Sequence, residues 1–235
     1  RWDARERRGL LWCNGLVPAL ATAGHPDRIV HVHSTVSRAR QALVTVARRR
    51  ARAVLVPSKS MLDDVRRAAV FSNWVAPVAA PARDPRRDNA FVVGYLGRLS
   101  VDKGVPILAR ALRVLDDAHP GRFRLVLAGE PRFVSEHDRE EVEDALTRVT
   151  GLVDRPGWIE PSDLFARVDL LVCPSVWAEP FGLVAAEAMA ARTPLIVSDA
   201  GALTEVVGAT GSAIVPAGDA PALAATILHY AEGRV

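Results

Sequence analysis

The sequence predicts an α/β protein built on doubly wound parallel sheets, and three observations lead to this fold class. Short continuous apolar runs recur along the chain, as strands buried on both faces of a parallel sheet require. Helical segments separate these runs, in the strand and helix alternation that places helices on both faces of such a sheet. A hydrophobic share of 49% and a charged share of 24% match an ordinary globular protein.

The second half of the chain shows this alternation most clearly. Its predicted strands are the apolar runs at 91–96, 124–128, 170–173 and 195–197. The predicted helices between them cover 106–118, 135–150, 162–167 and 183–191. Pro106 suits a first helical turn because its missing N–H has no partner to lose there. Ser162 is a residue type that caps helix N-termini.

The first half repeats the pattern in shorter form. Strands are predicted at 28–32 and 53–56, each followed by a helix, and the first helix is predicted from about Ser37 to Arg52. Two or three such units make half of a doubly wound domain, so we expect the first domain to be incomplete in this chain. A proline-rich, weakly apolar stretch then indicates a linker. The expected domains are a partial first domain at 1–76, a linker at 77–90, and a second domain at 91–235.

The charge is unevenly distributed between the two halves. Residues 1–89 hold 17 Lys and Arg against 7 Asp and Glu, whereas 90–235 hold 13 against 20. The first half could therefore meet an anionic acceptor or membrane surface, or its arginines could simply be solvated near a helix C-terminus. Nucleic acid is not an expected partner, because aromatic residues are not interleaved with the arginines.

Targeting signals and cysteines bear on the compartment. No apolar run approaches the ~20 residues that cross a bilayer, and the first residues are too charged for a signal peptide. Only Cys13 and Cys173 could pair, and Cys173 lies in an apolar run typical of a buried, unreactive thiol. We expect a cytoplasmic protein with, at most, peripheral membrane contact.

A phosphate-binding loop is predicted where the strand 91–96 gives way to a helix. Gly97 and Gly104 allow the backbone to approach a ligand closely, while Arg98 and Lys103 supply positive charge. The helix N-terminus adds backbone N–H donors. A nicotinamide site fits less well, because the complete glycine pattern is missing and Glu130 comes 33 residues after Gly97 rather than ~20.

Two glutamates flank a second helix start. Glu179 and Glu187 are eight residues apart around the segment Pro180–Leu183, a span of ~12 Å if helical, so they cannot form a close acid and base pair. They can instead accept hydroxyl hydrogen bonds at two ends of one long ligand. A sugar, a diphosphate and a ribose in sequence would suit this spacing, with the diphosphate at the helix N-terminus.

These segments resemble the retaining glycosyltransferases of family 4, which have the GT-B architecture of two Rossmann-like domains. The resemblance runs from Phe91 to about Glu232 and departs from the family mainly in the first half. It implies transfer of a sugar, of the hexosyl type, from a nucleotide diphosphate sugar to an acceptor hydroxyl with retention of anomeric configuration. The matching segments, in family order, are Gly97–Leu99, Lys103–Gly104, Leu125–Gly129, Gly157–Ile159, Glu179 and Glu187.

The resemblance also implies a role for each site residue. Arg98 and Lys103 would hold the donor diphosphate, and Glu187 would hold the ribose hydroxyls. Glu179 and the backbone of Phe181–Leu183 would hold the sugar. No cofactor or metal is expected, and the chain contains no Asp-x-Asp triplet, the carboxylate pattern that metal-bridged donors usually need.

Two further positions complete the predicted site. The turn Gly157–Ile159 is implied to lie near the base, and His33 follows a strand where relatives often place an active-site histidine. The expected catalytic residues are His33, Arg98, Lys103 and Glu179. The expected donor-binding residues are Gly97, Arg98, Lys103, Gly157, Trp158, Ile159, Glu179, Phe181, Gly182, Leu183 and Glu187. A binding protein without transfer activity and a nucleotide-sugar epimerase are the alternatives, and the base, sugar and acceptor are left open.

Overall fold

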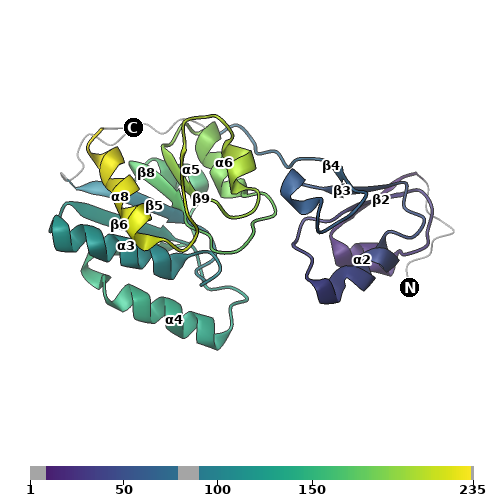
Figure 1. Ribbon diagram of the computed structural model, residues 1–235, viewed down its shortest axis with the longest axis horizontal. Coiled ribbons are helices and arrows are strands. Elements are labelled where there is room, and N and C mark those ends of the chain that lie inside the picture. The colour runs from purple at the N-terminus through teal and green to yellow at the C-terminus, as the bar shows by residue number, and fades with distance from the viewer. Residues whose placement is uncertain (1–8, 79–89, 234–235) are drawn as a thin grey trace. The chain divides into compact units, whose positions relative to one another are not determined.

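The computed structural model describes residues 9–78 and 90–233 (Figure 1). Contacts divide the chain into a first unit, Arg1–Asn73 with Glu179–Phe181, and a second unit, Trp74–Ala178 with Gly182–Val235. Most of the predicted linker at 77–90 lies outside the described residues. Each unit is built on a sheet of parallel strands, which confirms the predicted fold class.

The first unit has a four-stranded sheet in the order β1-β2-β3-β4. Its helices bury a cluster of small and branched apolar side chains, including Val30 and Val54, against one face of the sheet. Its elements are β1 (Leu11–Asn14), α1 (Leu16–Ala21), β2 (Arg28–His31), the 3-10 turn η1 (Arg38–Arg40), α2 (Gln41–Ala47), β3 (Ala53–Val56), the 3-10 turn η2 (Lys59–Met61) and β4 (Ala69–Val70).

The helix expected to reach Arg52 ends at Ala47, so that prediction was wrong at its C-terminal end. The helix predicted after β3 was also wrong, because only the 3-10 turn η2 separates β3 from β4. The buried guanidinium of Arg28 donates to the carbonyl oxygens of Ala47 and Arg49 at 2.5 and 2.7 Å. Arg50 has a left-handed φ of 58°, which a continuing right-handed helix does not allow. The arginines after Ala47 therefore form a turn that leads into β3.

The second unit has a six-stranded sheet in the order β10-β9-β8-β5-β6-β7. This is the strand order of the dinucleotide-binding Rossmann fold, and it reverses direction between β5 and β8, where such sheets bind ligands. Its elements are β5 (Phe91–Leu96), α3 (Val105–Ala118), β6 (Phe123–Ala128), α4 (Glu136–Thr147), the 3-10 turn η3 (Thr150–Leu152), β7 (Val153–Gly157), α5 (Pro161–Phe165), β8 (Leu170–Cys173), α6 (Leu183–Ala190), β9 (Leu195–Ser198), α7 (Leu203–Val207), β10 (Ala213–Val215) and α8 (Ala220–Ala231).

Alternate residues of the strands supply two apolar cores, one on each face of this sheet. Leu125 and Leu127 pack with side chains of α3, α4 and α8, whereas Val126 and Ala128 pack with side chains of α5, α6 and α7. This alternation explains why β6 is apolar at every position from Leu125 onward, because both faces of the strand are covered. Figure 1 shows α3, α4 and α8 on one side of the strands and α5 and α6 on the other.

The predicted strands and helices of this unit agree with the structure to within a few residues, with two local corrections. Glu160 rather than Ser162 occupies the N-cap of α5, because Pro161 takes the first helical position. Cys173 is half-buried rather than buried, since it ends β8 at the edge of the core. Within 9–78 and 90–233, the helices are all too short or too polar to span a bilayer.

Candidate donor-binding site

The loop after β5 is fixed by its own backbone and by the neighbouring strand. Gly97 has a φ of 154°, and its N–H donates to the carbonyl oxygen of Ala128 at 3.1 Å. The hydroxyl of Tyr95 donates to the carbonyl oxygen of Arg98 at 2.6 Å. Gly104 is in the left-handed conformation, with a φ of 75°, and serves as the N-cap of the 14-residue helix α3. The loop therefore delivers Arg98 and Lys103 to the N-terminus of α3, as predicted.

The loop after β8 packs directly on this loop. A Cβ placed on Gly104 would lie 1.8 Å from the carbonyl oxygen of Pro174. The N–H of Val176 donates to the carbonyl oxygen of Asp102 at 2.9 Å, and the Lys103 Nζ lies 5.3 Å from the centre of the Trp177 ring. Because β5 and β8 flank the point where the strand order reverses, these contacts assemble a site where open α/β sheets bind ligands.

Arg98 is held within the loop by a carboxylate. Its Nη2 lies 2.5 Å from Oδ2 of Asp102, and both side chains are about one-third exposed, at 36% and 33%. The hydroxyl of Ser100 donates to the other carboxylate oxygen of Asp102. The Arg98 Nε is buried and has no acceptor among the described residues. An anionic ligand at this loop could bind the exposed part of the Arg98 side chain.

The turn after β7 lies beside the loop after β5. Gly129 links them, because its N–H donates to the carbonyl oxygen of Gly157 at 2.8 Å and an added Cβ would lie 1.8 Å from the carbonyl oxygen of Gly97. Trp158 is 60% exposed, whereas Ile159 packs against the apolar core on the α5 side. The turn therefore offers an exposed indole beside a fixed backbone.

The second predicted helix start is the N-terminus of α6, where Gly182 packs closely against Leu203. Gly182 has a φ of 98° and is the N-cap of α6, and a Cβ there would lie 2.5 Å from Leu203 at the start of α7. Leu183 opens the helix and is exposed. Glu187 is half-buried one turn further along.

A repulsion between two carboxylates relates α6 to the segment that follows β7. Burial raises the pKa of the Glu187 carboxyl, and the negative charge of Glu160 raises it further. Glu160 directly follows Ile159 in the chain. The Glu187 carboxyl is therefore influenced by the charge of the residue that directly follows the turn Gly157–Ile159.

Three predicted residues belong to the first unit instead. His33 is exposed just after β2, and its ring lies against Gly15, where a Cβ would be 3.1 Å from the His33 Cε1. Glu179 is buried, at 7% exposure, and Phe181 is half-buried. These three residues are therefore not among those that the second unit brings together.

Three residues at the site were missed by the sequence analysis: Asp102, Glu160 and Trp177. Asp102 lies between Gly97 and Gly104, in the loop that was predicted to bind phosphate, whereas Trp177 lies two residues before Glu179, outside the predicted segments. Their own signals were weak, because a loop aspartate and a loop tryptophan are common in proteins without ligands. Only the contacts with Arg98 and Lys103 reveal them.

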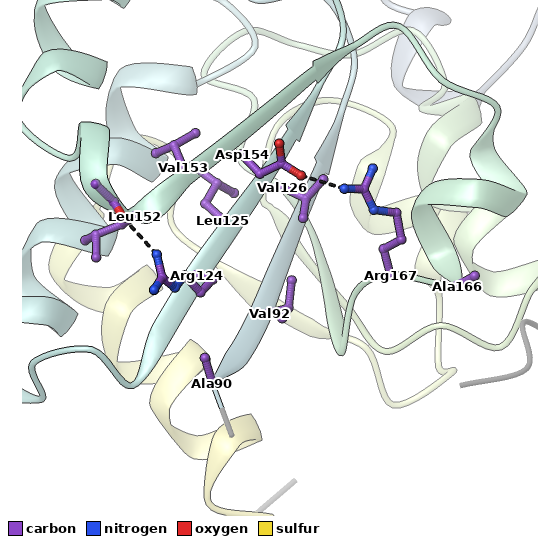
Figure 2. Close-up of a pocket in the computed structure, with 11 residues that line it drawn as sticks. Ala90, Val92, Arg124, Leu125, Val126, Leu152, Val153, Asp154, Ala166 and Arg167 are labelled. Atoms are coloured by element: carbon purple, nitrogen blue, oxygen red, sulfur yellow. Dashed lines mark hydrogen bonds and ion pairs between the residues drawn. The ribbon is translucent and has the colours of Figure 1, made fainter. Parts of the chain in front are cut away.

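A separate cavity of about 560 Å³ lies at the opposite, amino-terminal ends of β5, β6 and β7. Figure 2 shows Arg124 and Arg167 on either side of Val92 and Val126. Arg124 donates to the carbonyl oxygen of Gly151 at 2.9 Å, and Arg167 pairs with Asp154. No predicted site residue lines this cavity, so the site at the carboxyl ends of the strands is distinct from it.

Comparisons with known proteins identify a family for the second half of the chain. Residues 90–232 match the family described as glycosyl transferases group 1. A glycogen synthase of Mycobacterium tuberculosis is 38% identical over 176 residues, which are 73% of this chain and 40% of the relative. A D-inositol 3-phosphate glycosyltransferase of Stackebrandtia nassauensis is 33% identical over 139 residues, 55% of this chain and 31% of the relative. The chain therefore spans about two-fifths or less of these curated relatives.

Solved structures with the same fold include one that holds UDP-glucose. Anabaena Alr3699/HepE, solved with UDP-glucose, matches with a TM-score of 0.79 and 26% identity over 93% of this chain and 67% of that one. Sucrose-phosphate synthase of Thermosynechococcus elongatus matches with a TM-score of 0.78 and 24% identity over 94% of this chain and 63% of that one. With the matching family covering residues 90–232, this chain belongs to the glycosyl transferases group 1 family and has the GT-B fold.

Proposed function

We propose that the protein transfers a hexosyl group from a nucleotide diphosphate sugar to an acceptor hydroxyl, as the family 4 resemblance implies, with retention of anomeric configuration. The observation that carries this proposal is the junction of the loops after β5 and β8. It places Arg98 and Lys103 at the N-terminus of α3, at the point where the strand order reverses. The Anabaena structure that holds UDP-glucose supports a nucleotide-sugar donor.

In this proposal each part of the donor has its own partner. The diphosphate binds Arg98, Lys103 and a helix N-terminus. Glu187 accepts hydrogen bonds from the ribose hydroxyls, and the base lies on the turn Gly157–Ile159, beside the exposed Trp158. The nucleotide sugar is a substrate, and no separate cofactor takes part.

The sugar-binding part of the proposal rests on the segment before α6. Glu179 accepts hydrogen bonds from the sugar hydroxyls, and the backbone of Phe181–Leu183 orients the sugar at the helix N-terminus. His33 is proposed as a further residue that contacts the donor sugar. Negative charge grows on the leaving diphosphate as the anomeric C–O bond breaks, and fixed cations stabilise that charge without reorganising. The acceptor hydroxyl forms its new bond on the same face of the sugar.

Calorimetric titration of the full-length natural protein with UDP, GDP, ADP and dTDP tests the donor site. We expect one nucleotide to bind selectively and Lys103→Ala to weaken its binding about 10–100-fold, which corresponds to the ~1.5–3 kcal/mol of a charge-assisted hydrogen bond. Glu187→Ala should also weaken it. Arg113→Ala on α3 and Glu141→Ala on α4 remove the same charges outside the site and should leave affinity unchanged. Absence of binding to all four nucleotides would contradict the proposal.

Product analysis tests the reaction itself. With the matching nucleotide sugar and an acceptor, proton NMR of the first product should show the anomeric configuration of the donor. An inverted product would disprove retention. Conversion of the donor without an acceptor would identify an epimerase, and tight donor binding without turnover of any acceptor would identify a binding protein.

The proposal extends to a peripheral, cytoplasmic contact with an anionic membrane surface or an anionic acceptor. Arg49, Arg50, Arg66 and Arg67 are exposed on the first unit, and such clusters attract anionic surfaces. Co-sedimentation with vesicles of anionic and neutral lipids tests it. Binding to anionic vesicles alone, lost at high salt, is expected. Equal recovery with both kinds of vesicle would disprove membrane contact.

A further inference from the structure

Asp102 lies at the centre of the loop that carries the two predicted diphosphate-binding cations. Its carboxylate pairs with Nη2 of Arg98 at 2.5 Å and accepts a hydrogen bond from the hydroxyl of Ser100. Its backbone oxygen accepts the N–H of Val176 at 2.9 Å from the loop after β8. The carboxylate is therefore held beside Arg98 by contacts on several sides, within the loop where the donor diphosphate is proposed to bind.

This ion pair leaves Arg98 able to take a second partner. The guanidinium carries several N–H donors and Asp102 engages only Nη2. The Nε is buried without an acceptor among residues 9–78 and 90–233. Both side chains are also about one-third exposed, so an anion can reach Arg98 from solvent. A phosphate bound there would lie close to the fixed negative charge of Asp102.

We propose that Asp102 is a positioning residue that competes with the diphosphate for Arg98 and thereby speeds release of the nucleoside diphosphate product. This inference rests on the proposed function. Arg98 attracts the leaving diphosphate, which gains charge during the reaction, but the same attraction would hold the product after transfer. Asp102 keeps the guanidinium in place and partly offsets its charge, so that the product dissociates faster.

The sign of the effect distinguishes this role from a merely structural one. Two unit charges ~6–8 Å apart at the surface interact by an amount that corresponds to about a 2–10-fold change in affinity. Removing the Asp102 charge should therefore tighten binding of an anionic ligand. Loss of a structural contact would weaken nucleotide binding instead, because the loop after β5 would lose its conformation.

The test compares Asp102→Asn with a matched control in the full-length protein. Asparagine keeps an acceptor oxygen for Ser100 but removes the charge. Asp117→Asn removes the same charge from another Arg–Asp pair four residues apart, Arg113–Asp117, on α3. Each variant is titrated with UDP, GDP, ADP and dTDP at low and high salt, and the dissociation rate of the bound nucleotide is measured by stopped flow. Thermal unfolding checks that each variant is folded.

We expect Asp102→Asn to tighten binding of the nucleotide about 2–10-fold at low salt, through slower dissociation, and to lose most of this gain at high salt. Asp117→Asn should leave affinity unchanged. In an Arg98→Ala background the effect of Asp102→Asn should become smaller, because the competition acts through Arg98.

Unchanged or weaker nucleotide binding by folded Asp102→Asn would overturn this inference and leave the donor site standing. If Asp102→Asn does not fold, Asp102→Glu tests the same point with the charge kept, and only affinity near that of the natural protein is compatible with competition. Failure of the natural protein to bind any of the four nucleotides would overturn both proposals.

Discussion

The Cα of Gly104 approaches the carbonyl oxygen of Pro174 so closely that no side chain fits between them. A Cβ would lie 1.8 Å from that oxygen, and Gly104 also has a φ of 75°. These two residues join the loops after β5 and β8, which together carry Arg98 and Lys103 to the end of the sheet. Glycine at 104 is therefore required by the contact as well as by the turn.

Gly104→Ala is expected to destabilise the protein by about 2–5 kcal/mol, because left-handed strain and a backbone clash act together. Gly121→Ala is the control, since Gly121 has a φ of 72° and nothing within 4 Å of an added Cβ. It should cost only about 1–2 kcal/mol. Urea unfolding of both variants measures the difference, and equal losses would show that the contact with Pro174 is unimportant.

Glu187→Gln is expected to stabilise the ligand-free protein at neutral pH. Burial, with the charge of Glu160, raises the folded-state pKa of Glu187 above its ordinary value. Between those two pKa values the folded state binds more protons than the unfolded state, so stability falls as pH rises through this window. Glutamine carries no charge and avoids the loss. The Tm advantage of the variant should be present at pH 7.5 and shrink as pH falls to 4.

Glu141→Gln, on the exposed surface of α4, is the control for this comparison and should give no such gain at pH 7.5. A Glu187→Gln variant with the same Tm as the natural protein at pH 7.5 would contradict the raised pKa of Glu187. Glu160→Gln should give a smaller gain in Tm, because the charge of Glu160 raises the pKa of Glu187 less than burial does.

His31→Phe is expected to reduce the loss of stability in mild acid. Burial, followed by repulsion from His33, lowers the folded-state pKa of His31 below its ordinary value of 6.5. The contribution of neutral His31 to stability is therefore fully present above pH 6.5. It is lost as the pH falls from 6.5 toward the folded-state pKa, because protonation of His31 favours the unfolded state. Phenylalanine keeps the edge contacts with Trp12 and Phe71, whose ring centres lie 5.9 and 6.2 Å away.

Denaturant unfolding at pH 7.5 and pH 5.5 measures this effect in both proteins. The natural protein should lose more stability over this range than His31→Phe. Identical losses would show that His31 does not contribute to the acid sensitivity.

Arg28→Met is expected to destabilise the first unit by about 3–5 kcal/mol. Arg28 is fully buried and donates to carbonyl oxygens near the ends of both helices, including those of Ala19 and Ala47. Methionine would fill similar space but leave these acceptors without donors. Arg52→Met removes a surface ion pair with Asp27 and should cost at most ~1 kcal/mol. Calorimetric unfolding compares them, and equal losses would contradict a structural role for Arg28.

Arg28 also shows why charge counts predicted only part of the first unit. The excess of arginine there was expected either to meet an anionic partner or to be solvated at a helix end. One of those arginines is instead a buried link between two helices, which a strand-start arginine does not reveal in sequence. The helix predicted to Arg52 was too long for the same reason, because the Arg28 guanidinium binds the carbonyl oxygens of Ala47 and Arg49.

The strands of the second unit were predictable because both of their faces are buried. Leu125–Ala128 must be apolar at every position to serve two cores, and this leaves a continuous signal in the sequence. Shorter strands such as β10, with a half-exposed burial pattern, leave no such signal and were not predicted.

By itself, the sequence determined the α/β class, four strands and four helices of the second unit, and the glycines and cations of the loop that is predicted to bind phosphate. Each of these depends on local backbone conformation or on burial, and both restrict residue type directly. The tertiary structure alone decided the strand order that brings β5 beside β8, and with it the contacts of Asp102 with Arg98 and of Trp177 with Lys103. These residues are far less restricted in type, because their roles depend on which loops the sheet places side by side.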